Sequence, residues 1–224
     1  MNKTIVVTGG TKGIGRAIVD KFAKEGFTVI TCARKNEEVL PENVIFFKAD
    51  LSKKEEVLAF ADFVKNTVDK VDVLVNNTGF FLPGQIHNEE EGTLEAMIET
   101  NLYSAYHLTR ALVGDMIDRR AGYIFNICST ASITAYTNGG SYCISKFALL
   151  GMSKVLREEL KPFAIRVTSI LPGATFTNSW AGVELPTERF MASDDIAEVI
   201  WTAYCLPTTT VLEEIVMRPQ LGDI

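Results

Sequence analysis

The first fifteen residues constrain the fold of this chain more than any other stretch. Residues 4–8, TIVVT, are a short β-branched run that suits a strand buried on both faces, and they lead directly into GGTKGIG. A helical pattern follows, with apolar residues spaced for one helix face up to Gly26. Strand, glycine turn and helix in this order point backbone N–H groups and a helix N-terminus at one place, which favours the binding of a phosphate.

The glycines of this turn have an unusual spacing. Gly9, Gly13 and Gly15 give G-x-x-x-G-x-G rather than G-x-G-x-x-G. Because glycine is also the default residue of tight turns, such a cluster can be purely structural. The phosphate-binding interpretation therefore needs support from the rest of the chain.

The alternation of strand and helix continues to the end of the chain. Further short apolar runs predict strands at residues 27–32, 44–49, 71–75, 122–128, 164–171 and 213–217. Helical patterns predict helices at about 52–68, 89–117, 141–160 and 193–204. Ser52 with Glu55 is expected to form a capping box, and Ser193 is expected to be an N-cap.

This pattern predicts an α/β fold. We expect a single Rossmann-like, doubly wound domain over residues 1–224, with a mainly parallel seven-stranded sheet and helices on both faces. Residues 174–192 are mixed in character and are predicted to form a short substrate loop. No internal repeat, low-complexity tract or linker suggests a second domain.

The composition excludes several classes of function. The 224 residues include 22 basic and 28 acidic ones, a net charge of −6, and no long basic run, which argues against a nucleic-acid partner. The four cysteines lack CxxC spacing and there are two histidines, so neither a metal site nor a disulfide framework is expected. The apolar start is too short for a signal peptide, and no run reaches the length of a membrane span. We expect a cytoplasmic protein.

The end of the second predicted strand carries residues that discriminate between two dinucleotides. A protein that binds NAD(H) typically has an acidic residue there for the ribose hydroxyls, whereas this chain has Ala33, Arg34 and Lys35. A guanidinium forms charge-assisted, bidentate contacts with a 2′-phosphate, and Lys12 adds a second cation in the glycine turn. These residues favour NADP(H). The alternative is that they are ordinary surface cations.

A tyrosine and a lysine four residues apart are the strongest candidates for chemistry. Tyr142 and Lys146 would lie on one face of the predicted helix 141–160, and Ser129 precedes the tyrosine by thirteen residues. An ammonium ~4 Å from a phenol, at an effective dielectric of ~20, contributes about 4 kcal/mol and could lower the tyrosine pKa by roughly three units. Such a tyrosine could exchange a proton with an alcohol or carbonyl oxygen near neutral pH. In isolation, the same pair is more often a solvated helical pair.

Other residues near the predicted strand ends complete the candidate site. The NNTG of residues 76–79 follows the fourth strand, at the edge where parallel sheets gather ligands. Asn101 lies inside the predicted helix 89–117, where a structural amide is the alternative to a functional role. Several apolar residues could either line a pocket or belong to the core: Phe80, Phe81, Ile133, Tyr136, Trp180 and Phe190.

Together these motifs resemble the short-chain dehydrogenase/reductase family over nearly the whole chain. The TGGTKGIG of residues 8–15 matches its TGxxxGxG turn, and NNTG is similar to its NNAG, with Thr78 in place of the usual Ala. The remaining matches, in order and at family spacing, are Asn101, Ser129, Tyr142, Lys146, Pro172, Gly173 and Thr177. The chain departs from the family at Cys128, where a first Ser is common, and in lacking the Gly-Gly motif near the end of many members.

The resemblance implies catalytic roles for four residues. Tyr142 would be the acid/base, and Ser129 would hydrogen-bond the substrate oxygen. Lys146 would lower the pKa of Tyr142 and hold the nicotinamide ribose. Asn101 would anchor a water in a proton relay that reaches Lys146.

The resemblance also implies a set of cofactor-binding residues. Asp50 and Leu51 would border the adenine, Asn77 and Gly79 the adenosine-side ribose and nearby backbone, and Thr175 and Thr177 the carboxamide region. The full set expected to contact NADP(H) is Gly9, Thr11, Lys12, Gly13, Ile14, Gly15, Arg34, Asp50, Leu51, Asn77, Gly79, Tyr142, Lys146, Pro172, Gly173, Thr175 and Thr177.

These observations lead to one functional hypothesis and two alternatives. The leading hypothesis is an NADP(H)-dependent oxidoreductase that interconverts a carbonyl and a secondary alcohol, acting on a small molecule. A 3-oxoacyl-[acyl-carrier-protein] reductase is an alternative that the missing Gly-Gly motif weakens. A catalytically silent NADP(H)-sensing protein is an alternative of another class. The resemblance further implies a homodimer or homotetramer built on the helices that carry Asn101 and Tyr142.

Overall fold

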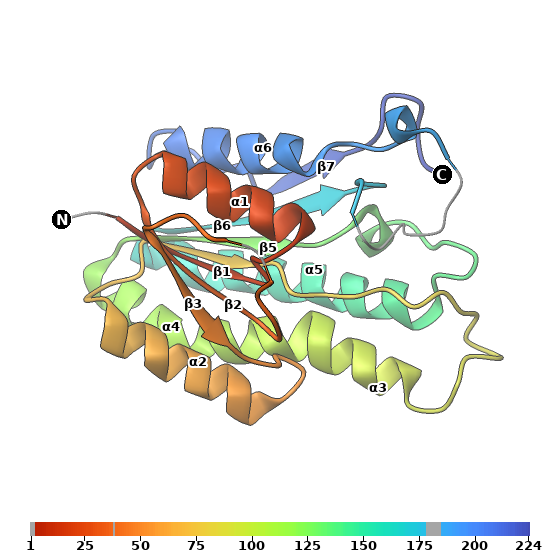
Figure 1. The fold of residues 1–224 in the computed structure, drawn as a ribbon, viewed down its shortest axis with the longest axis horizontal. Helices are drawn as coiled ribbons and strands as arrows, with labels where there is room; N and C mark the ends of the chain where they lie inside the picture. Colours follow the sequence, from red (N-terminus) through yellow and green to blue (C-terminus); the bar gives the residue numbers. More distant parts are fainter. Residues whose placement is uncertain (1–2, 38, 178–184) are drawn as a thin grey trace.

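The computed structural model describes residues 3–37, 39–177 and 185–224, and it consists of one parallel sheet between two layers of helices (Figure 1). All neighbouring strands run parallel, in the order β3-β2-β1-β4-β5-β6-β7. The strands are β1 (Thr4–Thr8), β2 (Thr28–Ala33), β3 (Val44–Lys48), β4 (Val73–Asn76), β5 (Gly122–Ile127), β6 (Ile165–Pro172) and β7 (Glu214–Met217). This confirms the predicted doubly wound α/β fold, with strand ends within two residues of their predicted positions.

The helices fall on both faces of the sheet, as Figure 1 shows. The α-helices are α1 (Gly13–Lys24), α2 (Lys54–Thr67), α3 (Thr93–Ile98), α4 (Ser104–Arg119), α5 (Gly140–Leu160) and α6 (Ser193–Cys205). Shorter helical turns are η1 (Glu99–Tyr103), η2 (Thr130–Ser132), η3 (Lys161–Phe163) and η5 (Thr187–Arg189). None of the helices in the described ranges is both long and apolar enough to cross a membrane.

Two cores separate the sheet from the helical layers, because successive strand residues point to opposite faces. In β1, Ile5 and Val7 pack with α1 and α6, whereas Val6 faces the layer of α2 and α4. Phe22 of α1 and Trp201 of α6 meet edge to face at 5.3 Å in the first core. With both faces covered, the sheet leaves its strand ends as the places where polar groups can gather.

The predicted helix 89–117 is wrong at its start and in its regularity. Gly92 has φ of +87°, a left-handed conformation that ends the preceding loop, and helical structure begins only at Thr93. Helical structure then runs through α3, the π-helical turn η1 and α4 to Arg119. The π turn contains Asn101, and π turns are often found at functional sites.

Both predicted helix caps are also wrong. Ser52 lies before α2, and its hydroxyl donates to Asp50 Oδ1 at 2.9 Å instead of capping the helix. Glu56, rather than Glu55, reaches back and accepts from the Asp50 N–H at 2.7 Å. Ser193 is the first residue of α6 rather than its cap. In each case a competing local hydrogen bond or a shift of one residue changed the start of the helix.

Candidate active site

Hydrogen bonds hold the residues that follow β4 against the start of the glycine turn, at the carboxyl end of β1. The Thr8 hydroxyl accepts the backbone N–H groups of Asn77 and Thr78, each at 2.9 Å, and the Asn77 amide donates to Thr8 O at 2.8 Å. A Cβ at Gly15 would lie 2.3 Å from Gly9 O and 2.4 Å from Asn77 Nδ2, so only glycine fits. Asn77 therefore supports the turn directly, a role that the sequence did not reveal.

The turn has the features of a phosphate site. Gly9 and Gly13 have φ of +68° and +52°, which aim successive peptide groups in directions that other residues rarely allow. Within the described part of the chain, no side chain caps the start of α1, and its first turn has no acidic residue. Unpaired N–H groups and the positive end of the helix dipole therefore remain for an anion.

Thr11 and Ile14, the remaining residues of this stretch in the predicted cofactor-binding set, have different surroundings. Thr11 is buried, and Ile14 packs its side chain against the core beside α1. The Ile14 side chain therefore serves packing, and any contact of this residue with a ligand would come from its backbone.

Cations lie beside the turn, where the sequence predicted them. Gly9 N–H donates to Cys32 O at 2.9 Å, so Arg34, two residues beyond and exposed, follows the strand that touches the turn. Lys12 is exposed in the turn and lies 3.9 Å from the Glu37 carboxylate, a contact too long and too solvated to occupy it fully. Both cations are thus exposed on segments that adjoin each other at the glycine turn.

Asp50 and Leu51, which were predicted to border the adenine, follow shortly after β3. Ala49 N–H donates to Ala33 O at 3.1 Å, which places Asp50 near Arg34, while Leu51 is buried. Burial alone would raise the pKa of Asp50, but two hydrogen bonds from Ser52 and the charge of Arg34 outweigh it and lower the pKa below its usual value. The carboxylate is therefore ionised at neutral pH.

Ser129 and Tyr142 meet at the carboxyl end of β5. Ser129 follows β5 by two residues, is buried, and accepts the Ala131 N–H at 3.1 Å. Its side chain is also hydrogen-bonded to the Tyr142 phenol. Tyr142, in the first turn of α5, meets the Phe81 ring edge to face at 5.0 Å. The serine and tyrosine thirteen residues apart are thus brought into direct contact.

Lys146 lies one turn along α5, on the same side as Tyr142. Its Nζ is 5.8 Å from the centre of the tyrosine ring and donates to Ile127 O at 2.9 Å. The side chain is only 5% exposed, and burial lowers its pKa to about 8. The ammonium is therefore held between the phenol and the end of β5.

The pKa of Tyr142 is not lowered in this arrangement, and the contribution of Lys146 to it stays a prediction. Burial raises the pKa of Tyr142 above its ordinary value, and the hydrogen bond to Ser129 opposes the rise only in part. The physical reason is desolvation, which disfavours the charged form of both the phenol and the ammonium. Tyr142 is consequently a neutral phenol at pH 7, the form that can donate a proton, and its acid/base role stays a prediction.

Asn101 is completely buried and fully engaged. Its Oδ1 accepts the Phe80 N–H at 2.9 Å, and its Nδ2 donates to Phe80 O at 3.0 Å and to Ser145 Oγ at 3.0 Å. A Cβ at Gly79 would lie 3.2 Å from Asn101 Oδ1 and 3.5 Å from Lys146 Nζ, so the three residues adjoin. The structural-amide interpretation is confirmed, while the water relay stays a prediction.

The segment after β6 returns to the glycine turn. Pro172 ends β6, Gly173 N–H donates to Met217 O at 2.8 Å, and Thr175 Oγ1 donates to Gly173 O at 3.1 Å. A Cβ at Gly13 would lie 3.1 Å from the Thr177 side chain, which puts Thr177 directly against the turn. The predicted carboxamide segment and the predicted phosphate turn are therefore neighbours.

Several contacts around the site were missed from the sequence, including the residues Ser132, Glu89 and Asp223 and the bonding partner of Tyr136. Ser132 Oγ accepts the Ser129 N–H at 3.2 Å and holds the serine in place. Tyr136 donates to Asp223 at 2.7 Å, which ties the C-terminal segment to the loop before α5. Glu89 accepts the Ser141 N–H at 2.9 Å. No sequence signal marks these contacts, since the last two join residues 87 and 52 positions apart.

The predicted apolar pocket residues have different environments. Phe81 and Ile133 are 41% and 45% exposed beside the Tyr142 region, whereas Phe190 is buried and packs on Phe176 at 5.7 Å. Trp180 lies outside the described residues, as do residues 178–184 of the predicted substrate loop. Phe81 and Ile133 are therefore the candidates for a substrate wall, and Phe190 is core.

Comparison with known proteins agrees with the geometry. The short chain dehydrogenase family model matches residues 3–186. Sepiapterin reductase from Chlorobaculum tepidum is 30% identical over 100% of this chain and 99% of its own. The NADP-dependent 3-hydroxy acid dehydrogenase YdfG of Salmonella typhi is 30% identical over 96% of this chain and 94% of its own.

A solved structure extends the similarity to three dimensions. The alcohol dehydrogenase of the archaeon Thermococcus sibiricus, complexed with 5-hydroxy-NADP, superposes with a TM-score of 0.91 at 26% identity and covers 100% of this chain and 99% of that one. The similarity in sequence and in fold thus extends over the whole length of the chain. This protein belongs to the short-chain dehydrogenase family.

Proposed function

We propose that this chain is an NADP(H)-dependent oxidoreductase that interconverts a carbonyl and a secondary alcohol. The observation that carries the proposal is the grouping of Ser129, Tyr142 and Lys146 at the carboxyl ends of the strands, where the glycine turn also lies. Two similar proteins support the cofactor, since one is named as NADP-dependent and another was solved with an NADP derivative. Arg34 and Lys12 provide the charges that a 2′-phosphate requires.

The protein's own residues suit the proton half of the reaction. NADPH, when bound, supplies a hydride to the carbonyl carbon. Ser129 orients the carbonyl oxygen, and Tyr142, a neutral phenol because burial raises its pKa, donates the proton to that oxygen. Lys146, with its pKa lowered to about 8, can then return a proton to the tyrosine or hold a ribose hydroxyl. A neutral phenol is the form that can donate this proton.

The substrate is proposed to have an apolar part next to its carbonyl. Phe81 covers one side of Tyr142 and is 41% exposed, and Ile133 follows the Ser129 turn at 45% exposure. Both can contact a small molecule held at the phenol. Simple aromatic ketones and β-ketoacyl thioesters therefore belong in the panel of test compounds.

The experiment is NADPH oxidation measured across that panel, with Tyr142→Phe as the control. We expect reduction of at least one carbonyl by the native chain and a large loss in the variant. Tight binding of NADPH without turnover of any carbonyl would instead identify a nucleotide-binding protein without activity. Equal rates in the native chain and the variant would remove Tyr142 from the mechanism.

We also propose that the chain forms a homodimer or homotetramer. Large apolar side chains are exposed along the outer faces of α4 and α5: Tyr103 (just before α4), Tyr106, Ile144, Phe147 and Val155. Patches of this kind are typical of interfaces. Light scattering of the purified chain tests this, and a monomer at micromolar concentration would contradict it.

A further inference from the structure

The catalytic helix α5 begins without a cap of its own. Its N-cap residue is Gly139, which has no side chain, and its first turn contains no acidic residue. Helices usually satisfy their first N–H groups with a Ser, Thr, Asp or Asn at this position. The missing acceptor comes instead from Glu89, in the loop between β4 and α3, 52 residues away in the sequence.

The Glu89 carboxylate is bound to the first turn through both of its oxygens. Oε1 accepts the Ser141 N–H at 2.9 Å, and Oε2 accepts the Ser141 hydroxyl. Ser141 directly precedes Tyr142, so the carboxylate acts on the peptide that carries the phenol. A displacement of this contact would move the phenol relative to Ser129.

Two glycines make the room for this carboxylate. A Cβ at Gly140 would lie 2.1 Å from Glu89 Oε1, and a Cβ at Gly84 would lie 2.6 Å from Glu89 Cγ. Backbone bonds hold the same two segments together: Gly84 N–H donates to Asn138 O at 3.0 Å, and Gly140 N–H donates to Gly84 O at 3.1 Å. The contact is therefore built into the fold rather than made by a mobile surface side chain.

The loop that carries Glu89 also contacts Tyr142 from a second direction. Phe80, four residues before Gly84, is held by Asn101, and Phe81 packs its ring on Tyr142. The loop thus reaches the tyrosine through an aromatic contact and through the start of its helix. Holding Glu89 in place therefore holds both of these contacts with Tyr142 in place.

We infer that Glu89 is a positioning residue for Tyr142, and that its negative charge at the start of α5 favours the protonated form of the phenol. A carboxylate there offsets the positive end of the helix dipole, which would otherwise favour the phenolate. The groups that face the phenol are the Ser129 hydroxyl, the Cys128 and Cys143 thiols and, one turn along, the Lys146 ammonium. The inference rests on the proposed function, since it assigns Glu89 a role through Tyr142.

The test uses Glu89→Gln and Glu89→Ala, with Glu91→Gln as a matched control. Glu91 is exposed in the same loop, so the control removes the same charge without touching α5. Glutamine keeps an acceptor for the Ser141 N–H and removes the charge, whereas alanine removes both. The rate of alcohol oxidation by NADP⁺ is measured against pH, together with kcat, KM and the Kd for NADPH.

In Glu89→Gln we expect the midpoint of the pH profile to fall by roughly 0.2 to 0.7 unit, the size of a helix-end charge effect. In Glu89→Ala we expect kcat to fall about tenfold with the Kd for NADPH within about twofold, since the nucleotide turn is untouched. An unchanged midpoint in Glu89→Gln, or native kcat in a folded Glu89→Ala, overturns the inference. If alanine prevents folding, the glutamine midpoint alone decides.

Tyr142→Phe, assayed in parallel, separates this inference from the proposed function. If that variant is inactive and the Glu89 variants behave like the native chain, only the inference fails. If Tyr142→Phe keeps its activity, the proposed function itself fails. Glu91→Gln is expected to match the native chain in every measurement.

Discussion

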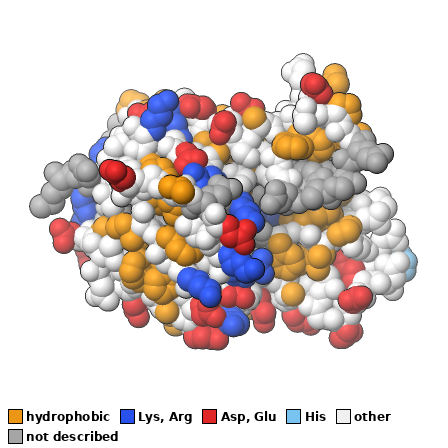
Figure 2. Space-filling model, viewed as in Figure 1, with side chains coloured by type: hydrophobic (Ala, Val, Ile, Leu, Met, Phe, Trp, Pro, Cys, Tyr) orange, Lys and Arg blue, Asp and Glu red, His pale blue; other side chains and the backbone are white. Residues whose placement is uncertain are grey.

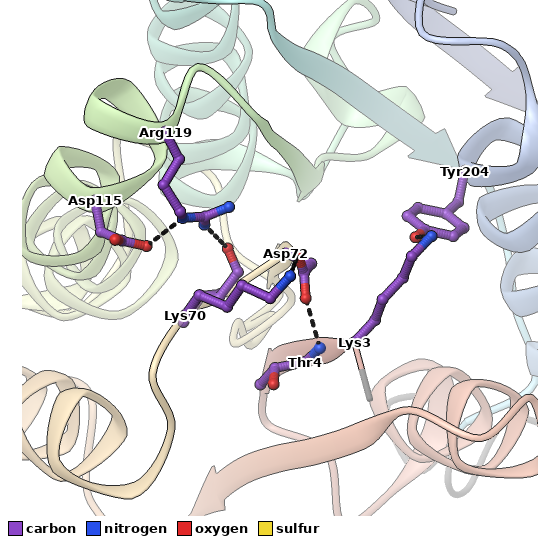
Figure 3. A network of polar contacts seen from close by, with 8 residues as sticks. Lys3, Thr4, Lys70, Asp72, Asp115, Arg119 and Tyr204 are labelled. Carbon is purple, nitrogen blue, oxygen red and sulfur yellow. Dashed lines mark hydrogen bonds and ion pairs between the residues drawn. The ribbon is translucent and has the colours of Figure 1, made fainter. Parts of the chain in front are cut away.

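The charged groups at the two ends of the strands differ in how they are paired. The amino ends form what we call the amino edge of the sheet, and the carboxyl ends form the carboxyl edge. At the amino edge, Asp72 accepts the Thr4 N–H at 2.9 Å and pairs with Lys70 at 3.2 Å, and Arg119 bonds both Asp115 and the Val71 carbonyl (Figure 3). At the carboxyl edge, the Lys146 ammonium is buried against the Ile127 carbonyl, and among the described residues no side chain caps the start of α1 after the glycine turn.

This difference separates stability from function within one sheet. Paired charges with short hydrogen bonds close the amino edge, where no ligand is expected in an open α/β sheet. Incompletely paired polar groups at the carboxyl edge cost stability but remain available for a dinucleotide and a carbonyl. On the face in Figure 2, basic and acidic side chains are interspersed. We therefore expect substitutions at the two edges to affect different measurements.

The largest effect is expected for Tyr142→Phe. Loss of the proton donor should lower kcat/KM for carbonyl reduction by about 10² to 10⁴, with little change in thermal stability. The matched variant at the other edge is Tyr204→Phe, which removes a hydroxyl that accepts from Lys3 at 2.6 Å. Steady-state kinetics should show native activity in Tyr204→Phe. A similar loss in both variants would contradict the separation of the two edges.

The next largest effect concerns Lys146 and the pH dependence of stability. Burial lowers its pKa from about 10.4 in the unfolded chain to about 8, so between these values the unfolded state binds more protons. The free energy of unfolding should therefore rise with pH across this window, by up to roughly 3 kcal/mol from this residue.

Urea unfolding of the native chain and of Lys146→Met at about pH 7.5 and about pH 10 measures this rise. The methionine variant should be the more stable at the lower pH, and its advantage should shrink at the higher pH as the native lysine loses its charge. A constant difference between the two proteins would show that Lys146 does not titrate in this range.

A smaller effect is expected for Arg34→Asp. Replacing a cation by an anion beside a 2′-phosphate should lower the ratio of NADPH to NADH efficiency by about 10- to 100-fold. The comparison of kcat/KM for the two cofactors measures this ratio, and Arg120→Asp, a cation at the far end of α4, is the control. A ratio unchanged by Arg34→Asp would show that another residue discriminates between the cofactors.

The smallest effect is expected at the amino edge, for Asp72→Ala. The buried Thr4 N–H would lose its side-chain acceptor and Lys70 its partner, at a cost of about 1 to 3 kcal/mol in the free energy of unfolding. Below the unfolding transition, activity should stay native. Chemical denaturation together with kinetics checks both statements, and a loss of kcat in the folded variant would count against them.

The order of elements could be predicted because its signals are local. The β-branched run of β1, the glycines after it and the apolar face of α1 lie within consecutive residues, and the same holds for each later strand and helix. Tyr142 and Lys146 are likewise related by one helical turn, so their shared face followed from spacing alone. Helix starts were less predictable. Ser52 forms a competing hydrogen bond with Asp50, and Ser193 lies one residue inside its helix.

The sequence by itself thus determined the α/β architecture, the glycine turn and the residue types of the site, since these depend on periodicity and on neighbours along the chain. Only the tertiary structure decided that burial raises the pKa of Tyr142, that Asn77 and Asn101 support the backbone, and that Glu89 caps the catalytic helix. Desolvation and hydrogen bonds between distant segments arise when the chain packs, and no short stretch of sequence carries them.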